Sequence, residues 1–440
     1  MRINVPVPAF SRLVRIVFAI AIAVFSSAPL FAQIALSNPP TNPPVWSSDP
    51  TVTSTDDWTN WKRNCSDMVH NFGKESVLNC GTSTFRSRPF HFVAQSIVPG
   101  SGTGGGGYYG RDLNNDIWQN KLELTGVITI RQFWFAEAKF TARRPHFGSF
   151  HSDENFAFQI YARNKQMQAL PFYGLGPNTT FTNQVQFSER DTRAGALIAS
   201  PFTSWLSASA TFEGIFPNIG RVDSTKITSI GQIYTEQTAP GLTSQPTFVH
   251  LEAFLRPHFA LAFEHLQFDY RFGYGYFHDT DTGHYSFRRF VADFGHSIYP
   301  ESENGHRRLD SVLSIRFRLS MADASATNAI PFYLQETIGG SDIDNQPTLR
   351  AFHDFRFRAP NSFLVQSEYD RRIIGPVGLL VFYDAGKVAF VRSDLNFSNM
   401  HQGFGGGISF FLAGKVVFRA YVGLGGGEGA HPYFGVANFL

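Results

Sequence analysis

The sequence predicts an all-β protein: a transmembrane antiparallel β-barrel of about 16 strands, preceded by a short N-terminal periplasmic segment. Composition is the first reason, because the 440 residues include 46 Phe and 39 Gly yet have a mean hydropathy of −0.14. A chain rich in aromatic residues but polar on average is typical of strands that face lipid on one side and a wet lumen on the other. A large secreted β-sandwich would share part of this composition.

The second reason is the alternation of apolar and polar residues in successive stretches. From Leu309 to Ser320, apolar residues alternate with polar ones that include Arg316 and Arg318. The stretches 132–143 and 415–424 follow the same period of two, which is the period of a β-strand. A sandwich would also alternate, but arginines repeated on the polar face favour a hydrated lumen.

The third reason is the parity of the connections, since an outer-membrane barrel has short turns at one end and long loops at the other. The expected strands lie near 89–98, 104–112, 117–129, 131–143, 154–164, 184–199, 203–217, 246–256, 259–274, 284–296, 309–320, 354–371, 376–390, 401–412, 414–425 and 431–440. The long connections follow the fifth, seventh, eleventh and thirteenth strands, at 165–183, 218–245, 321–353 and 391–400. The tight ones follow the sixth, eighth, twelfth and fourteenth, at 200–202, 257–258, 372–375 and 413. The long connections thus largely share one parity, although 297–308, after the tenth strand, is longer than this pattern predicts. An even strand count places both chain ends in the periplasm.

The N-terminus has the features of an export signal. Arg2, Arg12 and Arg15 precede the apolar run 16–25, and a small-residue cleavage site follows at Ala32. No later segment has about 18 uninterrupted apolar residues, so no membrane-spanning helix is expected. The sequence therefore divides into a signal peptide (1–32), an N-terminal periplasmic segment (33–85) and an outer-membrane barrel (86–440).

The N-terminal segment is rich in proline and contains the only two cysteines, Cys65 and Cys80. An oxidising compartment permits a disulfide between them, which would close a loop of about 16 residues and contribute on the order of 3 kcal/mol. A redox or metal role for the pair would need companion ligands that the segment lacks.

The sequence carries little that indicates chemistry. None of the 14 histidines has a metal-ligand spacing, and no Cys/His cluster exists. No nucleophile elbow is present, and the glycine run Gly104–Gly107 lacks the ending of a phosphate-binding loop. We therefore expect no enzyme, no cofactor and no metal, and a net charge of +2 gives no reason to expect nucleic acid.

The stretch 331–390 carries the most specific pattern. The tetrapeptide Leu349-Arg350-Ala351-Phe352 lies in a long polar, glycine-rich loop. The next strand carries Glu368, and the strand after that carries Asp384 on the face opposite a row of apolar residues. An acid on such a strand points into a wet lumen.

This pattern resembles the BamA/TamA-type barrels, the bacterial surface antigen family of outer-membrane assembly and translocation proteins. Ala351 stands where that family usually has glycine. The resemblance implies that the loop folds back into the lumen, where Arg350 pairs with Asp384 and Glu368 lies nearby. A lumenal pair is expected to be partly solvated and to contribute ~1–2 kcal/mol. An ion pair that merely fixes the loop would look the same in sequence.

The resemblance implies a barrel that inserts, exports or scaffolds protein or lipid at the outer membrane. Residues 33–85 are too short for the POTRA domains that such barrels usually carry, so a periplasmic partner protein is expected to supply client capture. Other expected partners are outer-membrane lipid, lipopolysaccharide and, during biogenesis, the barrel assembly machinery, whose C-terminal signal resembles Phe434, Gly435 and Phe439. The alternatives are a passive or substrate-selective pore and a surface-binding barrel. Weak pairing between 89–98 and 431–440 would favour insertion, and full pairing would favour a pore.

Overall fold

The computed structural model describes residues 62–63, 65–67, 76, 80, 89–144, 156–222, 227–261, 265–300, 310–412 and 415–436. The expected signal peptide at 1–32, most of the segment 33–85 and the final residues 437–440 lie outside the described residues. Cys65 and Cys80 are described, and a disulfide joins them. None of the described residues forms a helix long and apolar enough to cross a membrane.

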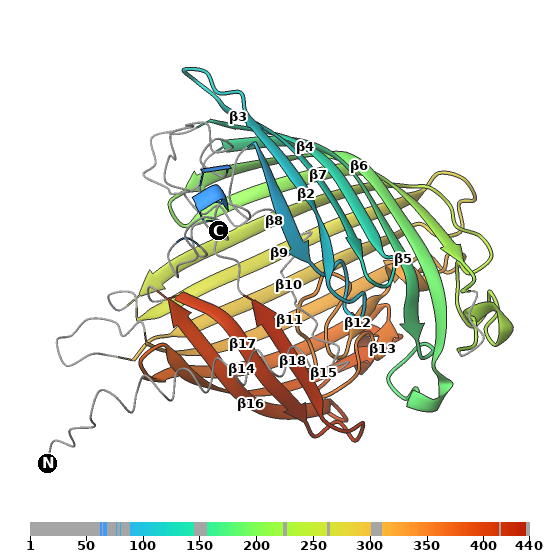
Figure 1. The fold of residues 1–440 in the computed structure, drawn as a ribbon. Coiled ribbons are helices and arrows are strands. Elements are labelled where there is room, and N and C mark those ends of the chain that lie inside the picture. The colour runs from blue at the N-terminus through green and yellow to red at the C-terminus, as the bar shows by residue number, and fades with distance from the viewer. Residues whose placement is uncertain are drawn as a thin grey trace, which may run out of the picture. The chain divides into compact units, whose positions relative to one another are not determined.

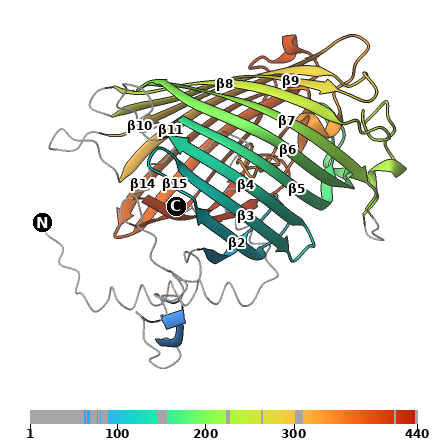
Figure 2. The same ribbon diagram turned by 90° about the horizontal axis from the view of Figure 1, so that it is seen from above.

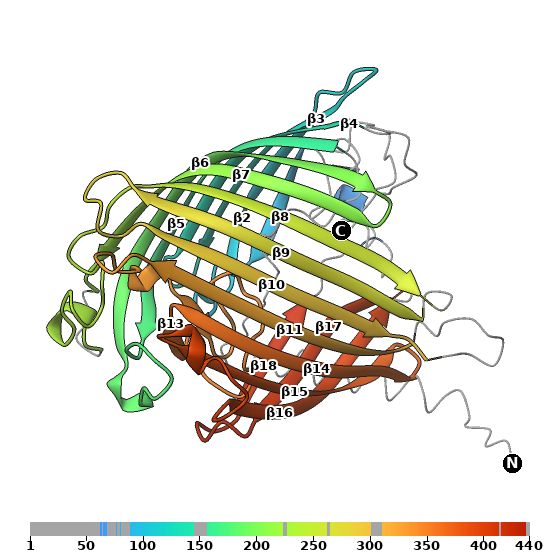
Figure 3. The same ribbon diagram turned by 180° about the vertical axis from the view of Figure 1, so that it is seen from behind.

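Sixteen antiparallel strands form one sheet, in which each strand pairs with its neighbours in chain order (Figure 1). The strands of this sheet are β1 (Phe90–Gln95), β2 (Gly104–Asp112), β3 (Gln119–Thr129), β4 (Trp134–Arg144), β5 (Phe156–Phe172), β6 (Val185–Thr203), β7 (Leu206–Gly220), β8 (Phe248–Leu261), β9 (Leu266–Asp279), β10 (Phe287–Ile298), β11 (Ser311–Ala324), β14 (Asn361–Ile374), β15 (Val377–Ala389), β16 (His401–Leu412), β17 (Lys415–Leu424) and β18 (His431–Val436). The tilted strands curve around a central lumen, as the view from above shows (Figure 2). Seen from behind, β8 to β11 form the near wall, and β18 lies on the far side (Figure 3).

The two faces of the sheet differ as a membrane barrel requires. On β15, Leu379, Val381 and Tyr383 are 53%, 54% and 42% exposed, whereas Phe382 and Asp384, which alternate with them, are buried. The outward face is therefore apolar and the inward face carries the polar groups, because neighbouring residues of a strand point to opposite sides. The predicted fold class, an antiparallel barrel of 16 strands, is confirmed.

Every expected strand is present, but several boundaries were predicted wrongly. The turn expected at 257–258 is wrong, because β8 continues to Leu261 and Pro257 falls inside it, opposite the first residue of β7, Leu206. A proline lacks a backbone N–H but is tolerated where the pairing with a neighbouring strand ends. Similarly, β5 continues to Phe172 instead of ending near 164.

The connections 173–184, 221–247, 325–360 and 390–400 are long and follow odd-numbered members of the sixteen-stranded sheet. We call the end of the barrel that carries them the loop end. The connections 145–155 and 299–310 belong to the opposite end and are also long, and the sequence indicated the second of them.

The connection between β11 and β14, which we call the arginine loop (325–360), folds into the barrel. The loop contains a two-stranded sheet made by β12 (Glu336–Ile338) and β13 (Phe357–Ala359). The expected strand 354–371 is thus divided, since residues 357–359 belong to this inner sheet and β14 begins at Asn361. Four short 3-10 turns complete the fold: η1 (Phe181–Asn183), η2 (Ile230–Gln232), η3 (Phe332–Leu334) and η4 (Arg392–Asp394).

The first and last strands of the sheet, β1 and β18, do not pair with each other within the described residues. We call this place the seam. Each of the other strands of the sheet is paired on both sides, so the seam is where the described hydrogen-bond ladder is interrupted.

Candidate functional site in the barrel lumen

Two glycines shape the turn that follows β12 in the arginine loop. Gly339 has a φ of 128° and Gly340 a φ of 51°, and a side chain on Gly339 would lie 2.5 Å from Cβ of Arg356. The φ of Gly339 together with this close approach requires glycine, because any side chain there would clash. The Gly340 N–H donates to the Leu349 carbonyl at 2.8 Å, and the Thr348 N–H donates to the Gly340 carbonyl at 2.9 Å. These bonds close the excursion 341–348 and present the next residues as a tip.

Arg350 lies at this tip and contacts two carboxylates of the barrel wall. Its Nε and Nη2 donate to the two oxygens of Asp384 on β15, both at 2.8 Å, and its backbone N–H donates to Asp384 Oδ2 at 3.1 Å. Its Nη1 donates to Glu368 on β14. The Arg350 side chain is 4% exposed and that of Asp384 is 0% exposed. A planar guanidinium fits a carboxylate in this two-point geometry, which is why arginine serves here better than lysine.

Aromatic rings and a second arginine extend the contact across the wall. The guanidinium of Arg350 lies 3.7 Å from the ring centre of Phe382, which adds a cation–π attraction. Arg419 on β17 reaches Glu368 at 3.0 Å and Asp370 at 3.3 Å. The arginine tip is therefore joined through Glu368 to a network that spans β14 to β17.

The residues that flank Arg350 pack against apolar groups inside the barrel. Leu349, Ala351 and Phe352 are buried in a cluster with residues of β12 to β15. Two glycines of the wall have no side chain and so let the loop approach closely. A side chain on Gly403 would lie 2.3 Å from Cβ of Ala351, and one on Gly423 would lie 2.0 Å from the Arg350 carbonyl oxygen. Ala351 is thus accommodated by a glycine of the wall.

The arginine loop also contacts the chain on both sides of the seam. On one side, the Asn345 side chain donates to the carbonyl of Ile97, just after β1, at 3.2 Å. On the other side, the Tyr433 hydroxyl of β18 donates to Asp354 at 3.1 Å, and Arg356 forms an ion pair with Glu428 in the β17–β18 connection. The loop therefore bridges the seam from inside, although β1 and β18 do not pair with each other in the described residues.

The structure brings together Arg350, Asp384 and Glu368, and it places Leu349, Ala351 and Phe352 around them. One expectation is corrected: the Arg350–Asp384 pair is buried rather than partly solvated. The loop packs on the pair and excludes water from it. Sequence reasoning missed Arg419, although the alternation of 415–424 had placed its side chain on the polar face.

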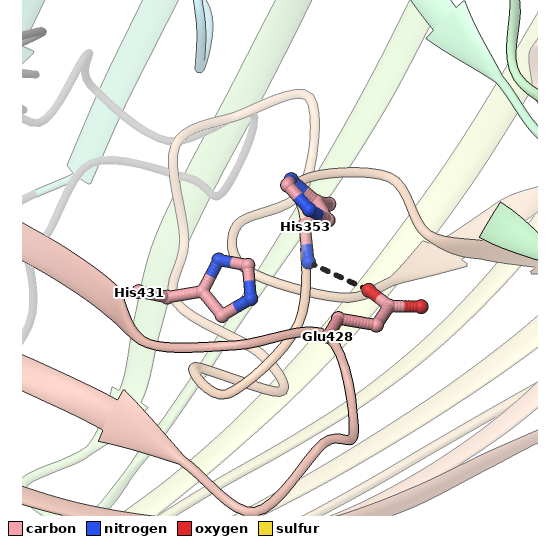
Figure 4. A group of neighbouring side chains, drawn as sticks. All are labelled: His353, Glu428 and His431. Carbon is pink, nitrogen blue, oxygen red and sulfur yellow. Dashed lines mark hydrogen bonds between the residues drawn. The ribbon is translucent and has the colours of Figure 1, made fainter. Parts of the chain in front are cut away.

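The spacing of the histidines in the sequence indicated no metal ligands, but folding brings His353, Glu428 and His431 together, with one ligand atom of each within 4.8 Å of the others (Figure 4). The group was not visible in the sequence because the arginine loop and the β17–β18 connection are far apart along the chain.

No protein-family model and no curated protein matches the sequence. Among solved structures, BamA from Haemophilus ducreyi lacking POTRA domains 1–3 is similar with a TM-score of 0.52 and 12% identity, over 79% of this chain and 67% of that one. The barrel has the BamA fold. CdiB from Acinetobacter baumannii has 13% identity over 76% of this chain and 55% of that one, and CdiB from Escherichia coli has 10% identity over 82% and 70%, both with a TM-score of 0.44. The expected resemblance to BamA is confirmed at the level of the fold.

Proposed function

We propose that this BamA-fold barrel lies in the outer membrane and inserts, exports or scaffolds protein or lipid there. The observation that carries the proposal is the seam. Edge strands have unpaired N–H and C=O groups, which form a template for another strand. Within a bilayer such groups must be satisfied by protein. A client strand that entered the seam would pair with the edge of β1 or β18, and a lipid headgroup would contact the same edge.

The arginine loop is the element that would hold the seam in register. Its contacts on the two sides of the seam, among them Asn345 with Ile97 and Tyr433 with Asp354, lie at the loop end. Arg350, which lies between Asn345 and Asp354 along the loop, fixes the loop to the wall. In this proposal Arg350, Asp384 and Glu368 form a clamp without a catalytic role. The clamp keeps the loop seated while the edge strands exchange partners.

A seam cross-link tests the proposal. Cysteines at Ala94 on β1 and Gly435 on β18, and at neighbouring positions because the register is not fixed, would be joined by a short bifunctional maleimide. A matched control joins Ala253 and Tyr274, which are partners on β8 and β9. In proteoliposomes, we expect the seam cross-link to abolish insertion of a denatured small barrel and transbilayer lipid movement, and the control to leave both intact. If both activities persist with the seam closed, the proposal is wrong.

A pore is the second candidate, and the lumen gives a specific reason for it. A cavity of about 320 Å³ lies beside the arginine loop and is lined by acidic and basic side chains in nearly equal numbers, among them Arg193, Glu213, Arg318 and Glu336. A lining without a dominant sign of charge suits small hydrophilic solutes better than selected ions. Steady conductance that is unchanged by the seam cross-link, with no insertion or lipid movement in any variant, would favour the pore.

The proposal also names partners. Outer-membrane lipid and lipopolysaccharide would surround the apolar face, the barrel assembly machinery would insert the chain, and a periplasmic protein would deliver clients. A pull-down from outer membranes with the chain as bait, compared with a chain that lacks residues 33–85, would identify a partner that uses the N-terminal segment.

A further inference from the structure

Two imidazoles and a carboxylate gather at the loop end, outside the clamp. His353 follows the arginine tip, Glu428 lies in the β17–β18 connection, and His431 is the first residue of β18. Figure 4 shows the three side chains on two neighbouring segments, with the backbone N–H of His353 donating to the Glu428 carboxylate. Their ligand atoms lie within 4.8 Å of one another, and all three residues are half-buried.

The composition of this group is that of a metal site. Two histidines and a glutamate bind zinc in many proteins, where a water occupies the remaining position. Zinc bonds of 2.0–2.2 Å place tetrahedral ligand atoms about 3.4 Å apart, so the side chains would close by about an ångström. The two imidazole planes stand at 87° with their centres 4.6 Å apart, so the rings do not stack face to face. Rotations of the side chains would be needed to place the three ligand atoms around one ion.

The surroundings hold the ligands in place. Glu428 is fixed by an ion pair with Arg356, which also donates to the hydroxyl and carbonyl oxygens of Thr179, both at 2.7 Å. Such outer contacts orient metal-binding carboxylates. Within the described residues, Nε2 of His431 is buried without a hydrogen-bond partner. A buried nitrogen of this kind normally has one, and a metal ion would satisfy it.

We propose that His353, Glu428 and His431 bind one divalent transition-metal ion, of which zinc is the representative. The ion would join the arginine loop to the β17–β18 hairpin at the edge of the seam. Metal binding would thus strengthen one of the two contacts by which the loop holds the seam. This inference does not depend on whether the barrel inserts clients or acts as a pore.

The test uses the full chain without a histidine tag, refolded in detergent and checked by its heat-dependent gel mobility. Zinc titrated against a competing indicator should bind once per chain. H353Q and H431Q should weaken binding by at least tenfold. The control H284Q removes an exposed imidazole from the β9–β10 connection, also at the loop end, and should leave binding unchanged.

Cobalt gives a readout that needs no variant. Bound Co²⁺ in the wild-type chain should give the strong visible absorption of a four- or five-coordinate ion, and zinc should remove this absorption by displacement. A weak octahedral spectrum, the absence of binding at a stoichiometric amount, or binding that is unaffected by both H353Q and H431Q would overturn the proposal.

Discussion

Removing the guanidinium of Arg350 isolates the energy of the clamp. Arg350→Ala leaves the carboxylate of Asp384, which is 0% exposed, with the Arg350 backbone N–H and a long contact of 3.4 Å from Gln366. Breaking a buried pair on one side costs about 3–5 kcal/mol, because the remaining charge is no longer compensated. We therefore expect the seated loop to lose about that much relative to the unseated one, several times the contribution of a solvated pair.

Hydrogen exchange measures this loss directly. The slowest amides of the tip should be those of Gly340, Thr348 and Arg350, whose N–H groups are bonded when the loop is seated. A loss of about 3–5 kcal/mol would accelerate their exchange by roughly two to three and a half powers of ten. Exchange in β6 and β8 should not change, because these strands are held by ladder bonds with their neighbours. In planar bilayers the same variant should give larger or noisier conductance.

Substitution of the partner Asp384 and of an exposed arginine tests whether the loss comes from the buried ion pair. Asp384→Ala should act like Arg350→Ala, and the double variant should be little worse than either, because residues in direct contact are not additive. Arg392→Ala removes an arginine from an exposed pair with Asp323, at 3.6 Å, and should cost no more than about 1 kcal/mol. Strictly additive effects of the first two substitutions would refute the clamp.

Three further predictions test the topology, the outer loops and the wall. Single cysteines in the β7–β8 connection should react with an impermeant thiol reagent on intact cells, whereas cysteines in the β6–β7 turn should not. Equal labelling would contradict the assignment of the loop end to the outer side of the membrane. Burial alone would raise the pKa of Glu236, but hydrogen bonds from Thr243, Gly241 and Tyr285 hold this pKa below its ordinary value. The stabilisation is therefore complete above the unfolded-state pKa of about 4.3 and is lost as the pH falls through the lower folded pKa; protease cleavage of the β7–β8 connection should rise there, and not in E236Q. Gly423→Ala should unseat the arginine loop and leave the barrel folded, while the matched change on β18 at Gly435, which has open space around it, should leave the loop seated and the barrel folded.

Much of the fold could be predicted because its signals are local. The alternation in 309–320 reports a strand with one apolar face, and β11 runs from Ser311 to Ala324. Strand ends were less predictable, as at Pro257, where the sequence indicated a turn but β8 continues to Leu261. Whether a proline ends a strand depends on which neighbour faces it, and the sequence does not state the register.

Some residues of the candidate site could also be predicted from the sequence, and others could not. Arg350, Asp384 and Glu368 could be named because the arginine motif and the two acidic strands stand in a fixed order along the chain. Arg419 could not be assigned to Glu368, because that contact depends on the register that sets Arg419 opposite Ser409 on β16. Burial of the Arg350–Asp384 pair could not be predicted from the sequence either, because it depends on how the arginine loop packs onto glycines of β16 and β17.

The contacts of the arginine loop couple the clamp to the seam. The loop is fixed to the wall by Arg350 and touches both sides of the seam, through Asn345 and Asp354. If seating of the loop stabilises the closed seam by some free energy, closure of the seam must stabilise the seated loop by the same amount, because coupling between two equilibria is reciprocal. A client that binds the open seam would therefore loosen the loop, and a substitution that unseats the loop would raise the affinity of the seam for a client. A plug that only blocked a pore would show no such reciprocity, so the coupling separates the two functions by their thermodynamics.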